Sequence, residues 1–115
     1  MNIKIIDGQI SRKELEEIAD HQFGNWVKAV VDITRGIIAI GGDLHADEEA
    51  VLLENGSQQE DLWGVNLRLA ENDDERIEFD SMINVRPRQG NRTRNIESQE
   101  IREKIRAIVD EHVVW

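Results

Sequence analysis

The chain has 115 residues and a formal net charge of −10, and 39% of its residues are hydrophobic. This length fits one domain with a single core, and the apolar content excludes a disordered chain although 33% of the residues are charged. The chain contains no cysteine, which excludes disulfides and thiolate chemistry and is typical of a reducing compartment.

The sequence shows no targeting or membrane segment. The N-terminal stretch MNIKIIDGQI lacks both a long apolar region and a small-residue cleavage site. The longest uncharged apolar run, GIIAIGG, is far too short to span a membrane. We therefore expect a cytoplasmic protein with no membrane contact. The acidic balance also disfavours nucleic acid as a partner, because the field of the protein repels phosphate.

The first elements along the chain are a short strand and a helix. Residues 3–6 are apolar enough for a strand. Ser11 and Glu14 have the spacing of a capping box, in which each side chain satisfies a free backbone N–H group at the start of a helix. An apolar stripe at helical spacing follows, and Gly24 is a typical residue just after a helix end. The pattern predicts a helix over 11–23.

A hairpin and an ambiguous segment come next. Residues 26–33 alternate apolar and polar side chains, and residues 37–42 follow after a short turn, which predicts two antiparallel strands. In segment 43–61, Asp47 can cap a short helix. Asn55-Gly56 is also a strong hairpin signal. The flanking residues are poor strand formers, so we favour the helix.

The last part of the chain predicts a second hairpin and a second long helix. Residues 62–69 and 76–86 alternate apolar and polar side chains, and a polar link joins them. Pro87 ends the second strand because it cannot donate a backbone hydrogen bond. Residues 98–113 carry apolar side chains on one helical face and charged side chains on the other.

The element order α-β-β-(α)-β-β-α predicts a two-layer α+β fold. Two hairpins, with or without the first strand, give an antiparallel sheet of four or five strands. Two helices with one apolar stripe each would cover one face of this sheet. The second face would then be polar and open to solvent, unless another segment covers it. The side chains on that face would be Asn66, Arg68, Glu78, Asp80, Met82 and Asn84.

The charges are divided between two segments. Residues 36–67 contain seven acids and no lysine or arginine, whereas residues 81–95 contain four arginines and no acid. We call residues 86–94 the arginine loop; its arginines are Arg86, Arg88, Arg92 and Arg94. They can pair with the acidic segment, within one chain or across a homo-oligomer interface, because guanidinium binds carboxylate through two parallel hydrogen bonds. Alternatively they bind a small anionic ligand, together with Asn84 and the helix start near Ser98.

Two residues are candidates for catalysis. The imidazole of His45 can exchange protons near neutral pH, and the carboxylate of Asp80 can act as a base. Against this, a lone histidine among acids and a lone carboxylate are most often solvated surface groups. Since the spacing of the surrounding acids matches no metal-binding motif, we expect no metal and no cofactor. The acids around His45 are Asp43, Asp47, Glu48 and Glu49.

Three runs of the sequence, LHADEEA, DLWGVN and FDSMINVRPRQGNRTR, resemble a small prokaryotic family known only as a domain of unknown function. The likeness extends from the helix at Ser11 to the last helix. The family pattern has Asp-Pro where this chain has Ser98-Gln99, and both pairs suit a helix start. The resemblance implies a single compact domain, and it assigns no activity, substrate or cofactor.

Two functions remain open from the sequence, and whether the chain is an enzyme is undecided. In the first, the chain is a small binding or interaction module, homo-oligomeric, whose arginine loop pairs with acidic groups or an anionic ligand. In the second, it is a small enzyme that acts on RNA or a phosphorylated substrate, as a toxin-like ribonuclease does, with His45 or Asp80 moving protons. The second function requires the fold to bring His45 or Asp80 within a few ångströms of the arginine loop.

Overall fold

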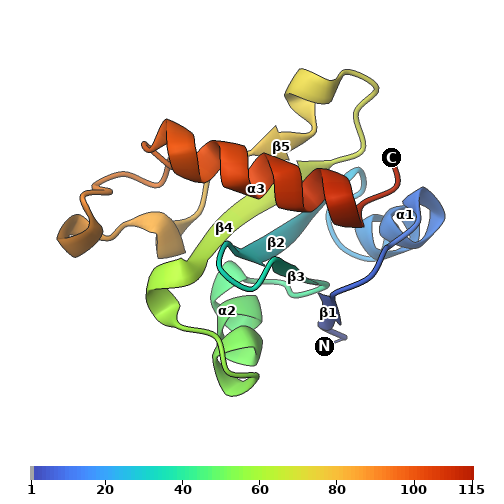
Figure 1. Cartoon of the computed structure of the whole chain (residues 1–115). Helices are drawn as coiled ribbons and strands as arrows, with labels where there is room; N and C mark the ends of the chain where they lie inside the picture. The colour runs from blue at the N-terminus through green and yellow to red at the C-terminus, as the bar shows by residue number, and fades with distance from the viewer. Residues whose placement is uncertain (1) are drawn as a thin grey trace.

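A computed structural model, which describes residues 2–115, shows an α+β fold built on one five-stranded sheet. The strands lie in the order β1-β3-β2-β4-β5, and every neighbouring pair is antiparallel. The strands are β1 (Lys4–Ile6), β2 (Trp26–Asp32), β3 (Ile37–Ile40), β4 (Leu62–Arg68) and β5 (Ile77–Glu78). The helices are α1 (Arg12–Asp20), α2 (His45–Glu54) and α3 (Gln99–His112) (Figure 1). The predicted fold class is confirmed.

Helices α1 and α3 cover one face of the sheet and enclose the larger core. The alternation that predicted the strands directs every second side chain of β2 and β4 into this core. Full burial of a valine or leucine side chain contributes about 1.5–3 kcal/mol to the free energy of unfolding. Among the helices in residues 2–115, none has both the length and the apolar character needed to cross a membrane. The strand residues in this core include Val27, Ala29, Val31, Trp63, Val65 and Leu67.

Serine caps fix the starts of α1 and α3, at Ser11 as predicted and at Ser98, where the last helix was expected to start. Ser11 Oγ accepts a hydrogen bond from the backbone N–H of Glu14 at 3.1 Å, and Ser98 Oγ accepts one from Ile101 at 3.2 Å. Helix α1 ends at Asp20, three residues earlier than predicted. There, Gly24 has a φ of 93° and its N–H bonds back to the helix end, a conformation that favours glycine.

Helix α2 covers the second face of the sheet, so the expectation of an open polar face is wrong. His45, Glu48 and Leu52 point inward from one side of this helix and are all buried. The short helix favoured for 43–61 is confirmed. The predicted cap at Asp47 is wrong, because α2 starts at His45 and the residue before it, Leu44, makes no side-chain cap.

The predicted strand over 76–86 ends at Glu78. Ser81 turns the chain instead, because its Oγ accepts a hydrogen bond from the N–H of Ile83 at 3.2 Å and starts a 3₁₀ turn over Met82–Asn84. Asn84 then fills the edge of β4 that the short β5 leaves open. Its side-chain amide accepts from Gly64 N at 2.8 Å and donates to Gly64 O at 2.9 Å, as a neighbouring strand would.

The 3₁₀ turn packs directly on the backbone of β4, and this contact requires glycine. A Cβ atom on Gly64 would lie 2.6 Å from the Cβ of Ser81, closer than real side chains approach. The turn therefore covers part of the second sheet face: Asn66 and Asn84 are buried, whereas Met82 remains 65% exposed.

We expect Gly64→Ala to lower the free energy of unfolding by about 1–3 kcal/mol, because the added methyl group forces Ser81 away from the sheet. Urea denaturation measures this loss. In a strand without such a contact, alanine in place of glycine should be neutral or stabilising. Gly8→Ala is the matched control, because no atom lies within 4 Å of its added Cβ. Equal stability of the Gly64→Ala protein and the wild type would contradict the close packing.

Candidate functional site

The backbone of the arginine loop is held from the inside by a buried asparagine. Asn91 is 4% exposed, and its side-chain N–H groups donate to three backbone carbonyls of the segment 84–95. Its Oδ1 accepts from the N–H of Glu97 at 2.8 Å. Arg86 and Asn91 also exchange two backbone hydrogen bonds, which close the turn at Gly90. A fully satisfied buried amide of this kind fixes one loop conformation.

Arg86 is occupied inside the protein. Its guanidinium donates to the backbone carbonyls of Gln59, Leu62 and Ile83, and it lies 4.9 Å from the ring of Trp63. It also pairs with Glu49 of α2 at 3.3 Å, and the two side chains are only 10% and 13% exposed. Here the acidic segment meets the arginine loop within one chain.

Burial shifts the pKa values of both members of this ion pair. It lowers the pKa of Arg86, an effect that the charge of Glu49 opposes. It likewise raises the pKa of Glu49, against the charge of Arg86. Each charge is thus tolerated at this depth because the other is present.

Arg94 brings the candidate base Asp80 to the arginine loop. Arg94 Nε donates to Asp80 Oδ1 at 2.7 Å, and a second guanidinium nitrogen lies 3.4 Å from Oδ2. Both side chains are about half exposed. The fold therefore meets the distance requirement of the enzyme hypothesis at Asp80. It also supplies a carboxylate that already neutralises this arginine.

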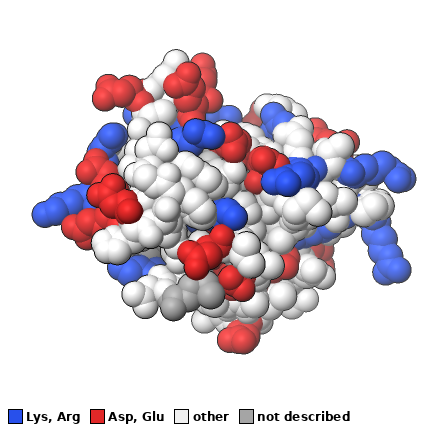
Figure 2. Space-filling view, turned by 180° about the vertical axis from the view of Figure 1, so that it is seen from behind, with Lys and Arg blue, Asp and Glu red and all other residues white. Residues whose placement is uncertain are grey.

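The guanidinium groups of Arg88 and Arg92 have no hydrogen-bond or ion-pair partner among residues 2–115, and both residues are exposed. Figure 2 shows basic side chains projecting into solvent at the right-hand edge, the side where the arginine loop lies after the turn from Figure 1. Of the four predicted anion-binding arginines, these two are the ones available to a ligand.

The backbone donors at the end of the arginine loop are already used. The carboxylate of Glu97 accepts from the N–H groups of Arg92 at 2.7 Å and Thr93 at 3.2 Å. The chain's own carboxylate thus takes the position predicted for an anion before the last helix. Asn84 was also predicted to bind an anion, but its side-chain amide is hydrogen-bonded to the backbone of Gly64 and the residue is 0% exposed. An external anion would therefore meet guanidinium groups alone.

A second polar cluster lies between α2 and the strand edge. His45 is 9% exposed, and its Nε2 lies 2.8 Å from the carbonyl oxygen of Val65. Because a carbonyl only accepts, Nε2 carries the proton. Burial lowers the pKa of His45, and the positive charge of Lys28 adds to this effect. The imidazole is therefore neutral at pH 7, and Nδ1 keeps its lone pair.

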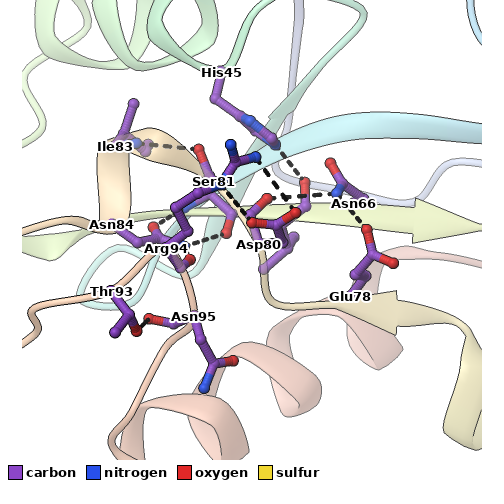
Figure 3. Close-up of polar contacts among 12 residues, drawn as sticks. His45, Asn66, Glu78, Asp80, Ser81, Ile83, Asn84, Thr93, Arg94 and Asn95 are labelled. Carbon is purple, nitrogen blue, oxygen red and sulfur yellow. Dashed lines mark hydrogen bonds and ion pairs between the residues drawn. The ribbon is translucent and has the colours of Figure 1, made fainter.

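Three polar residues, Asn66, Glu78 and Asp80, lie beneath His45 in Figure 3. Asn66 donates from Nδ2 to Glu78 Oε1 at 2.8 Å, and Glu78 pairs with Arg68 at 3.1 Å. The Oδ1 atom of Asn66 is buried and has no donor among residues 2–115. The cluster therefore joins a neutral histidine, an amide with a spare acceptor and the Asp80–Arg94 ion pair.

Glu48, one turn after His45, is a functional group that the sequence reasoning missed. It is 0% exposed, and its Oε2 accepts from the N–H of Gly42 at 3.0 Å. Burial raises its pKa to about 9, so the carboxyl is protonated at neutral pH. Its position three residues after His45 and four before Leu52 was the available signal, because these positions share one helical face.

The other two histidines lie elsewhere. His21 Nδ1 is 2.9 Å from the backbone oxygen of Glu17, and His112 joins the carbonyls of Gly8 and Gly36. No group of three or more histidine, aspartate or glutamate side chains within residues 2–115 is arranged to hold a metal.

Comparison with known proteins gives one match. The model of a family described as "Protein of unknown function (DUF5674)" matches residues 4–112, nearly the whole chain. No curated protein and no solved structure matches the chain. The family resemblance seen in the sequence is thereby confirmed, and its restriction to prokaryotes stays a prediction.

We expect Glu48 to make the protein less stable as the pH rises from about 5 to 9. Its pKa is 4.5 when unfolded and about 9 when folded, so the folded chain binds one more proton in this range. Stability then falls by about 1.4 kcal/mol per pH unit from this group. Glu48→Gln, which keeps a neutral side chain of equal size, should remove this slope in urea denaturation at pH 5, 7 and 9.

Glu54→Gln is the control, because Glu54 is an exposed acid at the end of the same helix. It should keep the wild-type pH dependence. Parallel stability profiles for the wild type and Glu48→Gln would show that Glu48 is ionised in the folded protein and would contradict its assignment as a neutral acid.

Proposed function

Because this chain belongs to the DUF5674 family of proteins of unknown function, membership assigns no activity, and we propose a function from the site itself. The chain is a small cytoplasmic binding module. Its arginine loop binds acidic groups of a protein partner through Arg88 and Arg92, and the partner is in the first instance another copy of the chain.

One observation carries this proposal: a loop fixed from the inside presents two cations that have no partner within the described residues 2–115. Asn91 and Arg86 hold the backbone through buried hydrogen bonds, while Arg88 and Arg92 extend into solvent. A preorganised loop loses little conformational entropy on binding, so more of the interaction energy remains as affinity. The planar guanidinium group matches the two oxygens of a carboxylate.

The charge of the whole molecule favours carboxylates on a protein over nucleic acid. At −10 the chain repels a polyanion at long range. A protein partner can offer a few carboxylates at short range within an otherwise mixed surface. A small anion would meet the same two guanidinium groups, so a titration must distinguish these ligands.

We expect a hexaglutamate peptide to bind at Arg88 and Arg92. In NMR titrations of the wild type, the Nε–Hε signals of these two arginines should shift together and saturate. The Arg88→Glu/Arg92→Glu variant should bind at least tenfold more weakly, and 0.5 M NaCl should weaken the wild-type interaction because these charges are exposed. Pyrophosphate, titrated separately, tests the small-anion alternative.

The control is Lys4→Glu/Lys13→Glu, which changes the net charge equally at two exposed residues far from the arginine loop in the sequence. It should bind hexaglutamate nearly as the wild type does. If both double variants lose binding to the same degree, the interaction depends on net charge alone and the proposed site is wrong.

A second candidate function is an enzyme that acts on RNA or a phosphorylated substrate, such as a toxin-like ribonuclease. One observation favours it: Asp80 lies 2.7 Å from Arg94, in the same cluster as the buried, neutral His45. In this function Arg94 would bind a phosphate oxygen, and Nδ1 of His45 or the carboxylate of Asp80 would accept a proton. General acid–base catalysis of this kind contributes about 10²–10⁴-fold to a rate.

This second function predicts cleavage of a fluorogenic RNA oligonucleotide or of p-nitrophenyl phosphate. His45→Gln and Asp80→Asn should each lower the rate at least a hundredfold, whereas His21→Gln, at an exposed histidine, should not. If His45 is the base, the acid limb of the pH–rate profile lies below pH 6.5, because burial lowers its pKa. Absence of cleavage, or cleavage that survives both substitutions, rejects this function.

A further inference from the structure

A groove of about 450 Å³ lies beside the arginine loop. Its walls are mixed. The apolar part comes from Met82, Ile83, Val85 and Pro87, and the polar part comes from Glu49, Gln59, Arg86 and Gln89, with Arg88 at the rim. Met82 is 65% exposed and Val85 38%. Exposed apolar side chains gathered around one hollow are typical of a surface that another protein covers.

The interior of the groove does not attract a charged group. It contains Arg86 and Glu49, which neutralise each other at 3.3 Å and are almost fully buried. Ile83 adds an apolar surface. It packs against a second, smaller core that is made by Val30, Ile37, Ala39, Leu52 and Leu62. The apolar part of the groove can therefore hold an apolar side chain of a partner, and among residues 2–115 the unpaired charges lie at its rim.

The rim carries charges of both signs. Arg88 has no partner among residues 2–115. Glu60 lies next to the arginine loop, because its backbone oxygen accepts a hydrogen bond from Gln89 Nε2 at 3.0 Å. Glu60 is exposed, and its carboxylate makes no hydrogen bond or ion pair with the part of the chain that the structure describes.

A patch that holds a partly apolar hollow, an exposed apolar side chain and an unpaired charge of each sign is complementary to itself. In a twofold dimer the same patch faces its copy, so each cation must find an anion on an identical surface. Arg88 and Glu60 satisfy this condition. A partner with acidic groups alone would leave Glu60 facing like charge.

We propose that this groove is a twofold interface with a second copy of the chain, an inference that rests on the proposed function and names its partner surface. Met82 of each copy enters the groove of the other, and Arg88 of each copy pairs with Glu60 of the other. The two copies repel at long range because each carries −10, so these local contacts determine whether the dimer forms.

Sedimentation velocity tests the interface by charge exchange. The wild type should dimerise at micromolar concentration, and Arg88→Glu and Glu60→Arg should each raise the dissociation constant at least tenfold. An equimolar mixture of these two variants should dimerise again, because positions 88 and 60 then carry opposite charges across both halves of the interface. Circular dichroism of each variant confirms that it is folded.

A second pair of variants tests the apolar contact. Met82→Ala should weaken the dimer at least tenfold. Leu53→Ala is the matched control, because Leu53 is a 40% exposed apolar residue of α2 that does not line the groove; it should dimerise as the wild type does.

The outcomes separate this inference from the proposed function. A monomeric wild type, or a mixture of charge variants that stays monomeric, overturns the interface. So does a dimer that Met82→Ala leaves unchanged. In each of these cases hexaglutamate binding at Arg88 and Arg92 can still hold. The opposite result is also possible: hexaglutamate does not bind, but the wild type dimerises and the two charge variants dimerise when mixed. That result keeps the interface and rejects the binding of acidic partners in general.

Discussion

The site depends on one buried side chain, the amide of Asn84, which takes the place of a strand. Strand β5 has only two residues, so the edge of β4 at Gly64 has no backbone partner. Asn84 supplies both the donor and the acceptor that this edge needs. A buried backbone group without such a partner would cost about 1–3 kcal/mol. This single pairing lets the chain leave the sheet early and still remain attached to it, which is how the arginine loop comes to lie beside α2.

The second face of the sheet combines apolar packing with polar groups that are kept neutral. Glu48 is protonated and His45 is uncharged for the same reason, since burial disfavours the charged form of each. On the other face, beside the larger core, α3 buries one histidine, His112, whose ring nitrogens lie at the backbone oxygens of Gly8 and Gly36. The buried polar groups of the second face contribute less to stability than apolar side chains at the same positions would, because each loses its contact with water.

The sequence predicted the elements whose signals are local. Ser11 and Ser98 marked the starts of α1 and α3, alternation marked β2 and β4, and the short turn after β2 marked β3. It failed over 76–86, where the alternation continues past Glu78 but the side chains of Ser81 and Asn84 bond to backbone and replace the ladder. It also failed to place α2 against the sheet. Two of the three buried positions of that helix are His45 and Glu48, so its inward face has no apolar stripe to detect.

The four arginines that lie close together in this acidic chain have different roles. Arg86 attaches the loop to the rest of the chain. Its planar guanidinium group donates to three carbonyls, pairs with Glu49 and lies against the ring of Trp63. The ammonium group of a lysine cannot make all of these contacts at once. Arg94 is neutralised by Asp80. Among residues 2–115, no ion-pair partner exists for the other two arginines of the loop, Arg88 and Arg92. The positions of the arginines in the sequence could not predict these different roles, because each role depends on a partner that is 14 to 37 residues away in the chain. Part of the positive charge of the loop therefore holds the loop to the rest of the chain. The part that a partner can bind is that of Arg88 and Arg92.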